Sequence, residues 1–399
     1  MRTCTITASL LFAALLIAGA PAHSQGSDWE NLNAEAKSLF RKGQYDRAAI
    51  LAQKALEVAE RFNGAEHPSV ATILNDLAEI YKAQGQYAQS EPLYKRALAI
   101  RQKTFGSEHP NVATTQSNLA ALYLHQGKYT TAEPLLRQSL ATVERSLGPD
   151  DPSVATILNN LAWMYHAQGQ YRQAEPLYKR ALTIYEKALG PEHPQAAFSL
   201  NNLAELYRLQ NQYARAEPFY LRALSIREKA LGPDHPDVAT SLNDLGLLYE
   251  SQGKYSQAEP LYERALAIHE KALGPDHSHV AATLNNLAQI YSVRGQYERA
   301  EPLYKRSLAI VESTLGRDHR YVGISLINLG SLYKSQGKYA EAEPLYKRAL
   351  TIFEHALGTS HPDVATAKSH LAGLYRTMGR GNEAETLEAE AARIRAIRR

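Results

Sequence analysis

Carboxamide side chains recur at fixed intervals in this chain and are its first candidates for binding another molecule. Asparagines precede Leu-Ala or a related dipeptide at several places, and a carboxamide offers the donor and the acceptor that a peptide group needs. Two uses are open. The amides bind the main chain of an extended ligand, or each binds a neighbouring helix end or loop carbonyl and holds the fold together, because a buried amide requires a partner. The candidates are Asn118, Asn159, Asn160, Asn201, Asn202, Asn243, Asn285, Asn286 and Asn328.

A second group of candidates varies in residue type where the asparagines recur. Trp163 occupies a position that holds Glu, Ala, Leu, Gln, Ser or Gly elsewhere, so packing does not require tryptophan there. Together with Phe198 and Leu124 it predicts an apolar patch, and tryptophan is a frequent anchor of binding hot spots. His166 and Arg208 belong to the same set of variable positions. The alternative is that Trp163 folds against its own surface, since single exposed apolar residues are ordinary.

Histidine, cysteine and acidic residues do not form a pattern typical of metal binding or catalysis. Seven of the 14 histidines hold one repeated position (His67, His109, His193, His235, His277, His319 and His361). Successive members are 42 residues apart or a multiple of that, so they cannot converge on one ion, and the proline that follows most of them indicates a helix start. The single cysteine is Cys4. No Gly-x-Ser-x-Gly, phosphate loop or His-Glu-x-x-His is present. We therefore expect no enzyme activity, no metal and no cofactor.

The charge balance argues against a polyanionic partner. Lys and Arg number 44 and Asp and Glu number 41, for a formal charge of +3. That excess is too small for a protein that binds nucleic acid without sequence preference. The variable positions also carry nearly balanced charge. We expect a partner of mixed or weakly polar chemistry, and no nucleic acid.

These candidates must be positioned by a repeat of 42 residues. Tyrosines stand at Tyr45, Tyr87, Tyr129, Tyr171, Tyr213, Tyr255, Tyr297 and Tyr339, without insertion or deletion between them. A strict period of this length indicates stacked supersecondary units rather than separate domains. The predicted fold class is all-α, a solenoid of nine helix pairs. The units are about 28–67, 68–109, 110–151, 152–193, 194–235, 236–277, 278–319, 320–361 and 362–399.

Each unit has the pattern of two helices. In the second unit Leu74, Leu77 and Tyr81 lie on one face of a first helix at 3.6 residues per turn. Gly85 predicts the end of that helix, because a glycine readily adopts the positive φ of a helix stop. A second helix follows, and Pro92 is expected near its start, where a missing N–H costs little.

The repeat resembles a known family. Leu-x-Asn-Leu-Ala-x-Leu-Tyr-x-x-Gln-Gly-x-Tyr-x-x-Ala-Glu is similar to the tetratricopeptide repeat, and the spacing with Glu-Pro-Leu-Tyr-Lys-Arg-Ala-Leu and Leu-Gly-Pro-x-His-Pro resembles the kinesin light chain subclass. The resemblance covers nearly all of the chain after the leader. It implies a right-handed superhelix whose first helices line a concave groove that binds extended peptides or partner proteins, with asparagines on the ligand main chain.

The N-terminus has the pattern of a secretory signal. Arg2 precedes a charge-free apolar run from Ile6 to Ala20, and Ala20-Pro21-Ala22 is a small-x-small cleavage pattern. The run is shorter than the roughly 20 residues that cross a bilayer, which disfavours the alternative of an uncleaved anchor. We expect residues 1–22 to be a signal peptide and 23–399 the repeat solenoid. The mature protein would then be periplasmic or secreted, without a membrane span.

The functional hypothesis is a monomeric, non-catalytic scaffold that binds an extended peptide or partner protein in its concave groove. One alternative is a structural scaffold of an envelope or extracellular assembly that acts through its convex face and its ends. The other is an accessory subunit that recruits a separate enzyme.

Overall fold

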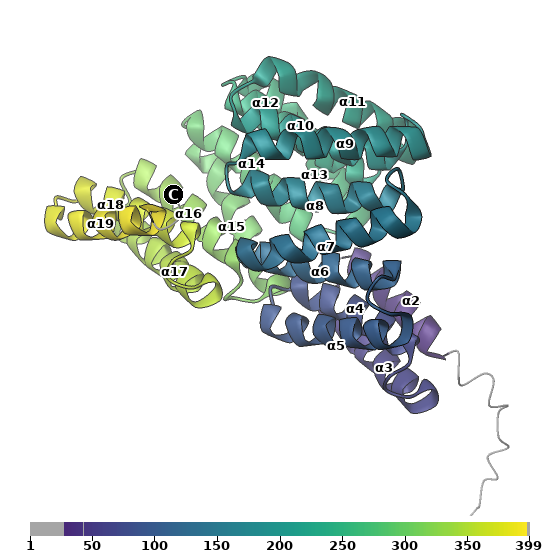
Figure 1. Cartoon of the computed structure of the whole chain (residues 1–399). Helices are drawn as coiled ribbons and strands as arrows, with labels where there is room; N and C mark the ends of the chain where they lie inside the picture. Colours follow the sequence, from purple (N-terminus) through teal and green to yellow (C-terminus); the bar gives the residue numbers. More distant parts are fainter. Residues whose placement is uncertain (1–27, 43, 397–399) are drawn as a thin grey trace, which may run out of the picture.

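Helices begin and end at the repeated His-Pro and glycine positions of the sequence. The computed structural model describes residues 28–42 and 44–396, and the regular elements within them are α-helices arranged as nine successive pairs (Figure 1). The first helices are α2 (Asp28–Arg41), α4 (Pro68–Ala83), α6 (Pro110–His125), α8 (Pro152–Ala167), α10 (Pro194–Leu209), α12 (Pro236–Ser251), α14 (Ser278–Val293), α16 (Arg320–Ser335) and α18 (Pro362–Thr377). The second helices are α3 (Tyr45–Asn63), α5 (Tyr87–Phe105), α7 (Tyr129–Leu147), α9 (Tyr171–Leu189), α11 (Tyr213–Leu231), α13 (Tyr255–Leu273), α15 (Tyr297–Leu315), α17 (Tyr339–Leu357) and α19 (Gly381–Ala396).

The predicted fold class, an all-α solenoid of nine helix pairs, is confirmed. The predicted signal peptide, residues 1–22, lies outside the described residues. Between residues 28 and 42 and between 44 and 396, none of the helices is both long enough and apolar enough to cross a membrane.

The repeated histidines cap the first helices. Nδ1 of His109 accepts a hydrogen bond from the backbone N–H of Asn111 at 3.1 Å, and Pro110 takes the first helical position, where no N–H is needed. Asp151 caps α8 in the same way through its carboxylate, at 2.8 Å. The helix-start role predicted for the histidines is confirmed. The same bond is made by His67, His193, His235, His277, His319 and His361.

A residue with positive φ follows most of the first helices. Gly85 has a φ of 71°, and in the fifth pair Asn211 replaces glycine with a φ of 58°, which asparagine tolerates better than most residues. The second helix starts soon afterwards, at Tyr87 in the second pair. Pro92 is therefore the sixth residue of α5, and the prediction that it lies near the helix start was wrong. Its nitrogen cannot donate to the carbonyl of Ala88, so each helix of this kind lacks one internal hydrogen bond.

Tyrosines of the second helices are buried against small residues of the first helices. Tyr262 is fully buried, and a Cβ added to Gly246 would come within 2.6 Å of its ring. The position of Gly246 is alanine or glycine in the second to ninth pairs, which lets the two helices of a pair approach closely. Alanine, leucine and tyrosine positions of neighbouring pairs join into continuous core clusters.

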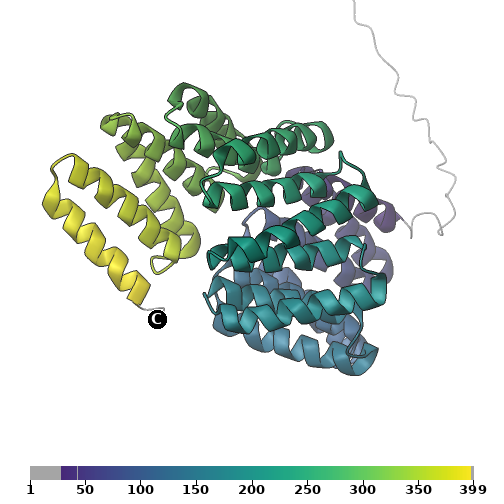
Figure 2. The same cartoon turned by 90° about the horizontal axis from the view of Figure 1, so that it is seen from above.

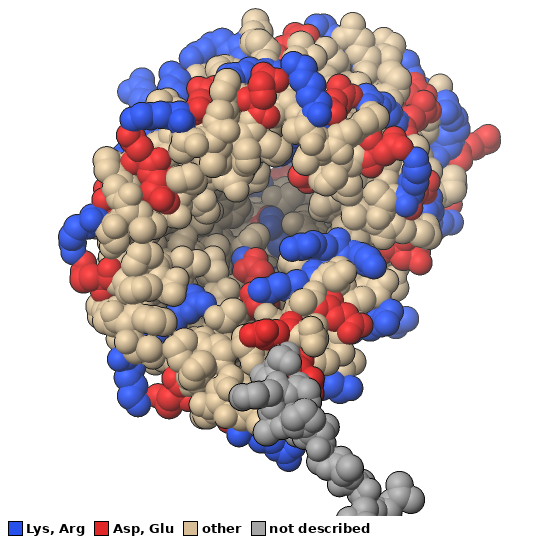
Figure 3. Space-filling model, turned by 90° about the vertical axis from the view of Figure 1, so that its right-hand side faces the viewer, with Lys and Arg blue, Asp and Glu red and all other residues tan. Residues whose placement is uncertain are grey.

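The stack curves so that the first helices line its inner face. Each second helix packs against the first helix of the next pair, and successive first helices also approach one another, as α4 and α6 or α10 and α12 do. Figure 2 shows the pairs following one another around a curved path, with α18 and α19 at one end. The space-filling view in Figure 3 shows a hollow at the centre of the molecule, with acidic and basic side chains around its rim. This hollow is the space that the first helices face.

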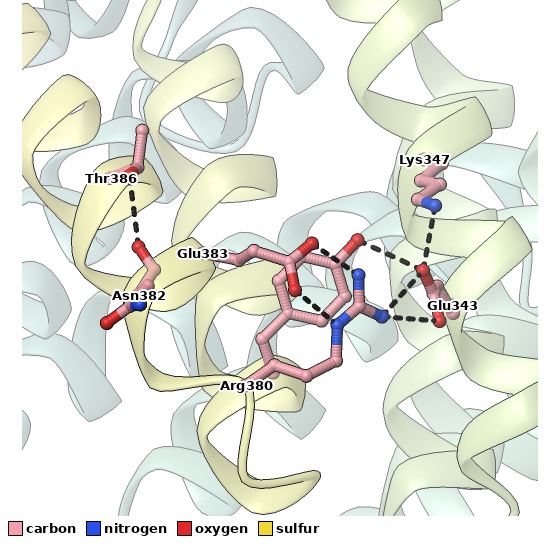
Figure 4. Close-up of polar contacts among 7 residues, drawn as sticks. Glu343, Lys347, Arg380, Asn382, Glu383 and Thr386 are labelled. Carbon is pink, nitrogen blue, oxygen red and sulfur yellow. Dashed lines mark hydrogen bonds and ion pairs between the residues drawn. The ribbon is translucent and has the colours of Figure 1, made fainter.

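Polar contacts bind each pair to the next. The Tyr375 hydroxyl donates to the carboxylate of Glu343 at 3.0 Å, and Arg380 and Lys347 bind the same carboxylate (Figure 4). The hydrogen bond from Lys347, more than any other contact, lowers the pKa of Glu343 to about 2. The same tyrosine–glutamate bond recurs in earlier pairs, which explains both the Leu-Tyr of the first helix and the Glu-Pro of the second.

Candidate functional site

Three apolar side chains of the fourth and fifth pairs are exposed on the first helices. Trp163 of α8 is 38% exposed, and Phe198 and Leu209 of α10 are 52% and 42% exposed. We call these three residues the apolar surface. Exposed apolar side chains are the candidates for binding an apolar part of a ligand, and these three lie on the first helices of two adjacent pairs.

Leu124 does not belong to the apolar surface, and the prediction that it does was wrong. Its side chain is only 3% exposed and lies in the core with residues of the neighbouring pairs. Equivalent positions hold Lys82 and Arg208, whose long side chains can carry a charged group out to solvent. A leucine at this position cannot reach out and packs into the core instead.

Trp163 interrupts a hydrogen-bonding pattern that runs through the stack. In four other pairs the buried tyrosine of the second helix pairs with a polar side chain at the Trp163 position, and in the sixth pair, where this position is Leu247, Tyr262 donates to Glu250 instead. Tyr220 donates to Glu205 at 2.8 Å and Tyr304 to Gln289 at 2.8 Å, and Tyr94 and Tyr346 pair with Glu79 and Ser331.

The fourth pair has no acceptor at this position, and the buried hydroxyl of Tyr178 has no partner. The sequence analysis missed this relationship. The signal that could have revealed it is a coupled change in the third pair, where Ala121 is matched by Leu136, which has no hydroxyl to satisfy.

His166 lies beside this unpaired hydroxyl. Its ring is 6.3 Å from that of Tyr178, centroid to centroid, and 5.8 Å from that of Tyr171. Nδ1 of His166 is buried and has no partner. Burial lowers the pKa of His166, and the carboxylate of Glu205 opposes this shift, so the imidazole is neutral at pH 7. The fourth pair, which contains Trp163, therefore has two buried polar atoms without partners, the Tyr178 hydroxyl and Nδ1 of His166. In the preceding pair, the ring of His125 lies 5.9 Å from that of Trp163, centroid to centroid.

Arg208 is engaged within the protein. Its guanidinium donates to both carboxylate oxygens of Glu205, at 2.7 and 2.6 Å, and to the hydroxyl of Ser251 at 2.8 Å. The hydrogen bond with Glu205 raises the pKa of Arg208 above its ordinary value. An anionic ligand would have to compete with this fork-shaped pair, so Arg208 does not act as an open anion site.

Six of the nine predicted asparagines donate a hydrogen bond to a neighbouring pair. Asn118 donates to Oδ1 of Asn75 at 3.0 Å, and Asn160 donates to the hydroxyl of Ser117 at 3.2 Å. These bonds serve the stack, as one of the two open uses requires. The remaining four bonds join Asn159 to Ser199, Asn201 to Asp244, Asn243 to Thr283 and Asn285 to Ser325.

Asn202, Asn286 and Asn328 make no side-chain hydrogen bond within the described part of the chain. All three are half-buried on first helices and share one position of the repeat. Their amides are free to bind a ligand, whereas those of Asn118 and Asn160 at the same position are already occupied. Ligand binding by these asparagines stays a prediction.

Acidic groups of the fifth and sixth pairs are partly neutralised by burial. Asp244 accepts a hydrogen bond from Asn201 at 2.8 Å, and burial, together with repulsion from Glu205, raises its pKa to about 7. Burial also raises the pKa of Glu250. Lys82 is paired with Glu79 at 2.6 Å. The inner face therefore presents few uncompensated charges.

Potential metal ligands are dispersed in the described part of the chain. In residues 28–42 and 44–396 no three His, Cys, Asp or Glu side chains come together in a way that could hold a metal ion. The repeated histidines instead use Nδ1 to cap helices, as described above.

Comparison with known proteins places the chain in a family. A sequence profile described as tetratricopeptide repeat matches overlapping segments at residues 31–103, 69–141, 111–187, 168–229, 213–271, 251–313, 279–355 and 324–396. The chain therefore belongs to the tetratricopeptide repeat family, whose fold is typical of protein–protein interaction scaffolds without catalytic activity. No curated protein matches the sequence.

Three solved structures illustrate the similarity. BtubC (BKLC) from P. vanneervenii is 27% identical, with 56% of this chain and 92% of that chain covered and a TM-score of 0.47. A putative kinesin light chain of nearly identical repeats from Podosopora anserina is 32% identical, with 51% and 97% covered and a TM-score of 0.42. A Rap protein complexed with Competence and Sporulation Factor is 16% identical, with 94% and 100% covered and a TM-score of 0.61.

Proposed function

We propose that this protein is an exported, non-catalytic scaffold that binds an extended segment of a partner protein or a peptide in the groove lined by its first helices. The observation that carries the proposal is Trp163. It is exposed at a position where four other pairs place a partner for a buried tyrosine, and the Tyr178 hydroxyl of its own pair has no partner. A residue that costs a buried hydrogen bond is retained more readily if it has another use, such as anchoring a ligand.

The surroundings of Trp163 define the ligand chemistry. The apolar surface suits an aliphatic or aromatic side chain, and the free amide of Asn202 on α10 suits a main-chain peptide group. Arg208 with Glu205 and Lys82 with Glu79 are already paired, so the groove favours a neutral or mixed segment over a strongly charged one. The Rap protein of the same fold was solved with a bound factor, so a chain of this fold can form such a complex.

The proposal is tested by affinity capture from the native envelope fraction. The mature protein, Trp163→Ala and Leu221→Ala serve as baits, because Leu221 is an apolar residue of the second helix α11 with similar exposure. A partner that binds the groove is lost with Trp163→Ala and retained with Leu221→Ala. The reverse pattern contradicts the proposal and supports a structural scaffold that acts through its convex face.

Export is part of the proposal and rests on the sequence of residues 1–22 alone. N-terminal sequencing of protein recovered from outside the cytoplasm should begin at His23 or within a few residues of it. An intact Met1 on membrane-bound material would show that the segment is an anchor.

A further inference from the structure

The curved stack closes on itself, so that its first two pairs meet its seventh and eighth pairs. Tyr45, at the start of α3, and Ser278, at the start of α14, line one cavity together. The turn at Gly85 lies directly against the ring of His319, which precedes α16. We call this contact region the seam. It makes the inner space a ring rather than an open trough.

A cavity of about 450 Å³ lies at the seam and has walls from both sides of it. Tyr45 and Ala83 come from the first two pairs, and the other lining residues come from α14, α15 and α16. The lining contains no Lys, Arg, Asp or Glu. Besides two tyrosines, its polar residues are Ser278, His279, Asn285, Asn286, Ser325 and Asn328.

Three carboxamides line this cavity with unused hydrogen-bonding capacity. Asn286 and Asn328 make no side-chain hydrogen bond within the described residues, and Oδ1 of Asn285 is buried without a partner. A buried amide oxygen without a partner carries a desolvation cost that a bound N–H group would relieve. Beside the amides, Val311, Leu315 and Ile324 supply aliphatic surface, and Tyr321 is 50% exposed.

We propose that this cavity is a second binding site, separate from the apolar surface, for an uncharged peptide segment with an aliphatic side chain. Asn286 and Asn328 bind main-chain N–H and C=O groups of the segment, and its side chain packs against Val311 and Ile324. An ionised side chain is disfavoured, because the lining offers no countercharge to replace its hydration.

The position of the cavity also gives binding a structural consequence. A ligand that contacts Tyr45 and α14 together interacts with both sides of the seam. Such a ligand binds the closed ring more tightly than a ring opened at the seam, so it shifts the population toward the closed state. The ligand thereby acts as a clamp between the two ends of one superhelical turn.

The binding step is tested with defined probes. Ac-Leu-Ala-Leu-NH2 is titrated against the mature protein by saturation-transfer NMR, with Ac-Glu-Ala-Glu-NH2 and Ac-Lys-Ala-Lys-NH2 as charged counterparts. The neutral probe should bind, and the charged probes should bind at least about fivefold more weakly. Combined Asn286→Ala and Asn328→Ala should weaken the neutral probe about tenfold, as two hydrogen bonds imply. Leu221→Ala, which changes an exposed side chain outside both proposed sites, is the control.

A variant that fills the cavity controls for an indirect effect of the asparagine substitutions on binding. Ala282→Phe should block the cavity, and the natural Phe198 at the same repeat position shows that phenylalanine is accommodated there. Thr240→Phe, one repeat earlier and outside the lining, is the control. Unchanged binding of the neutral probe in Ala282→Phe and in the double asparagine variant would overturn the proposal. The apolar surface suits the same neutral probe, so the asparagine variants are compared in a Trp163→Ala background, where the double asparagine change should still weaken the probe about tenfold.

The clamp is tested by cross-linking across the seam. In the mature protein, which begins after Cys4, Gln86→Cys and Asp318→Cys provide one thiol on each side, since both residues line the cavities along the seam. A short bismaleimide should link them with higher yield when the neutral probe is bound. An unchanged yield would show that binding does not close the ring.

Discussion

A Cβ added to Gly85 would clash with Cδ2 of His319. The two residues belong to the second and eighth helix pairs, so this contact joins parts of the chain that are far apart in sequence. Gly85 serves two purposes there. It supplies the positive φ that follows α4, and its lack of a side chain leaves room for the imidazole.

Replacing Gly85 by alanine should open the seam. Gly253 is a matched control, because its φ is also 71° and a Cβ there would meet nothing within 4 Å. Both substitutions carry the cost of a left-handed residue, about 1–2 kcal/mol. Only Gly85→Ala should also increase the radius of gyration in small-angle scattering. Equal scattering from the two variants would mean that the seam does not hold the ring closed.

Trp163→Gln should stabilise the fold while it removes groove binding. A glutamine at this position accepts the hydrogen bond from the second-helix tyrosine in the seventh pair, where Tyr304 donates to Gln289 at 2.8 Å. In the fourth pair it should do the same for Tyr178 and add about 1 kcal/mol. The expected result is a thermal midpoint at or above that of the wild type, with partner capture lost.

The opposite substitution supplies the comparison for Trp163→Gln. Gln289→Ala leaves the Tyr304 hydroxyl without its acceptor and should lower the midpoint without affecting capture. If Trp163→Gln lowers the midpoint as well, then Trp163 contributes to packing, and the unpaired Tyr178 hydroxyl is not the main effect of tryptophan on stability.

Substitution of Asn160 should lower stability and substitution of Asn202 should lower partner affinity, although the two residues share one position of the repeat. Asn160→Ala removes the bond to Ser117 and should cost about 0.5–1.5 kcal/mol of stability, with partner affinity retained. Asn202→Ala removes no internal bond and should leave the thermal midpoint unchanged. If Asn202 binds ligand main chain, its loss weakens the partner severalfold in a titration. A destabilised Asn202→Ala with unchanged affinity would assign it to the stack.

Two buried histidines, His269 and His277, should make the protein less stable in acid. The rings of His269 and His277 lie 5.2 and 4.9 Å from that of His279. Burial, and then repulsion from His279, lowers the pKa of His269 and of His277 to about 4. The unfolded chain, with a histidine pKa near 6.5, therefore binds protons first as the pH falls. Stability should be full above about pH 6.5 and should decline toward pH 4, by up to about 1.4 kcal/mol per pH unit for each histidine.

His269→Val identifies the contribution of this cluster. Valine occurs at the same repeat position in Val143 and Val311, so the substitution suits the fold. Denaturant midpoints at pH 7 and pH 5 should differ less for the variant than for the wild type. Equal differences would place the acid sensitivity elsewhere, for example at His125 or His319, whose pKa values are also lowered by burial.

The helices and their order could be predicted from the sequence because the signals that set them are local. His109 and Pro110 start a helix through groups two residues apart, and Gly85 ends one through its own φ. The period of 42 residues repeats these signals without interruption, so the nine pairs follow from the sequence alone. The position of Pro92 in its helix was predicted wrongly because the start of α5 at Tyr87 has no side-chain cap to mark it.

The candidate sites depended on contacts between pairs, and a single repeat position does not encode these. Asn160 and Asn202 are equivalent in the sequence, yet Ser117 occupies one amide while the other stays free, because the partner is a residue of the preceding pair. The burial of Leu124 also depends on neighbouring pairs, because its side chain packs into the core that they share.

The seam could not be predicted from the sequence. Whether Gly85 meets His319 depends on the sum of small rotations over all the intervening pairs, and only the tertiary structure determines that sum. Local chemistry in the sequence thus determined the helices and their period. The tertiary structure decided which amides are free and where the ring closes, because both depend on how successive pairs are rotated against one another.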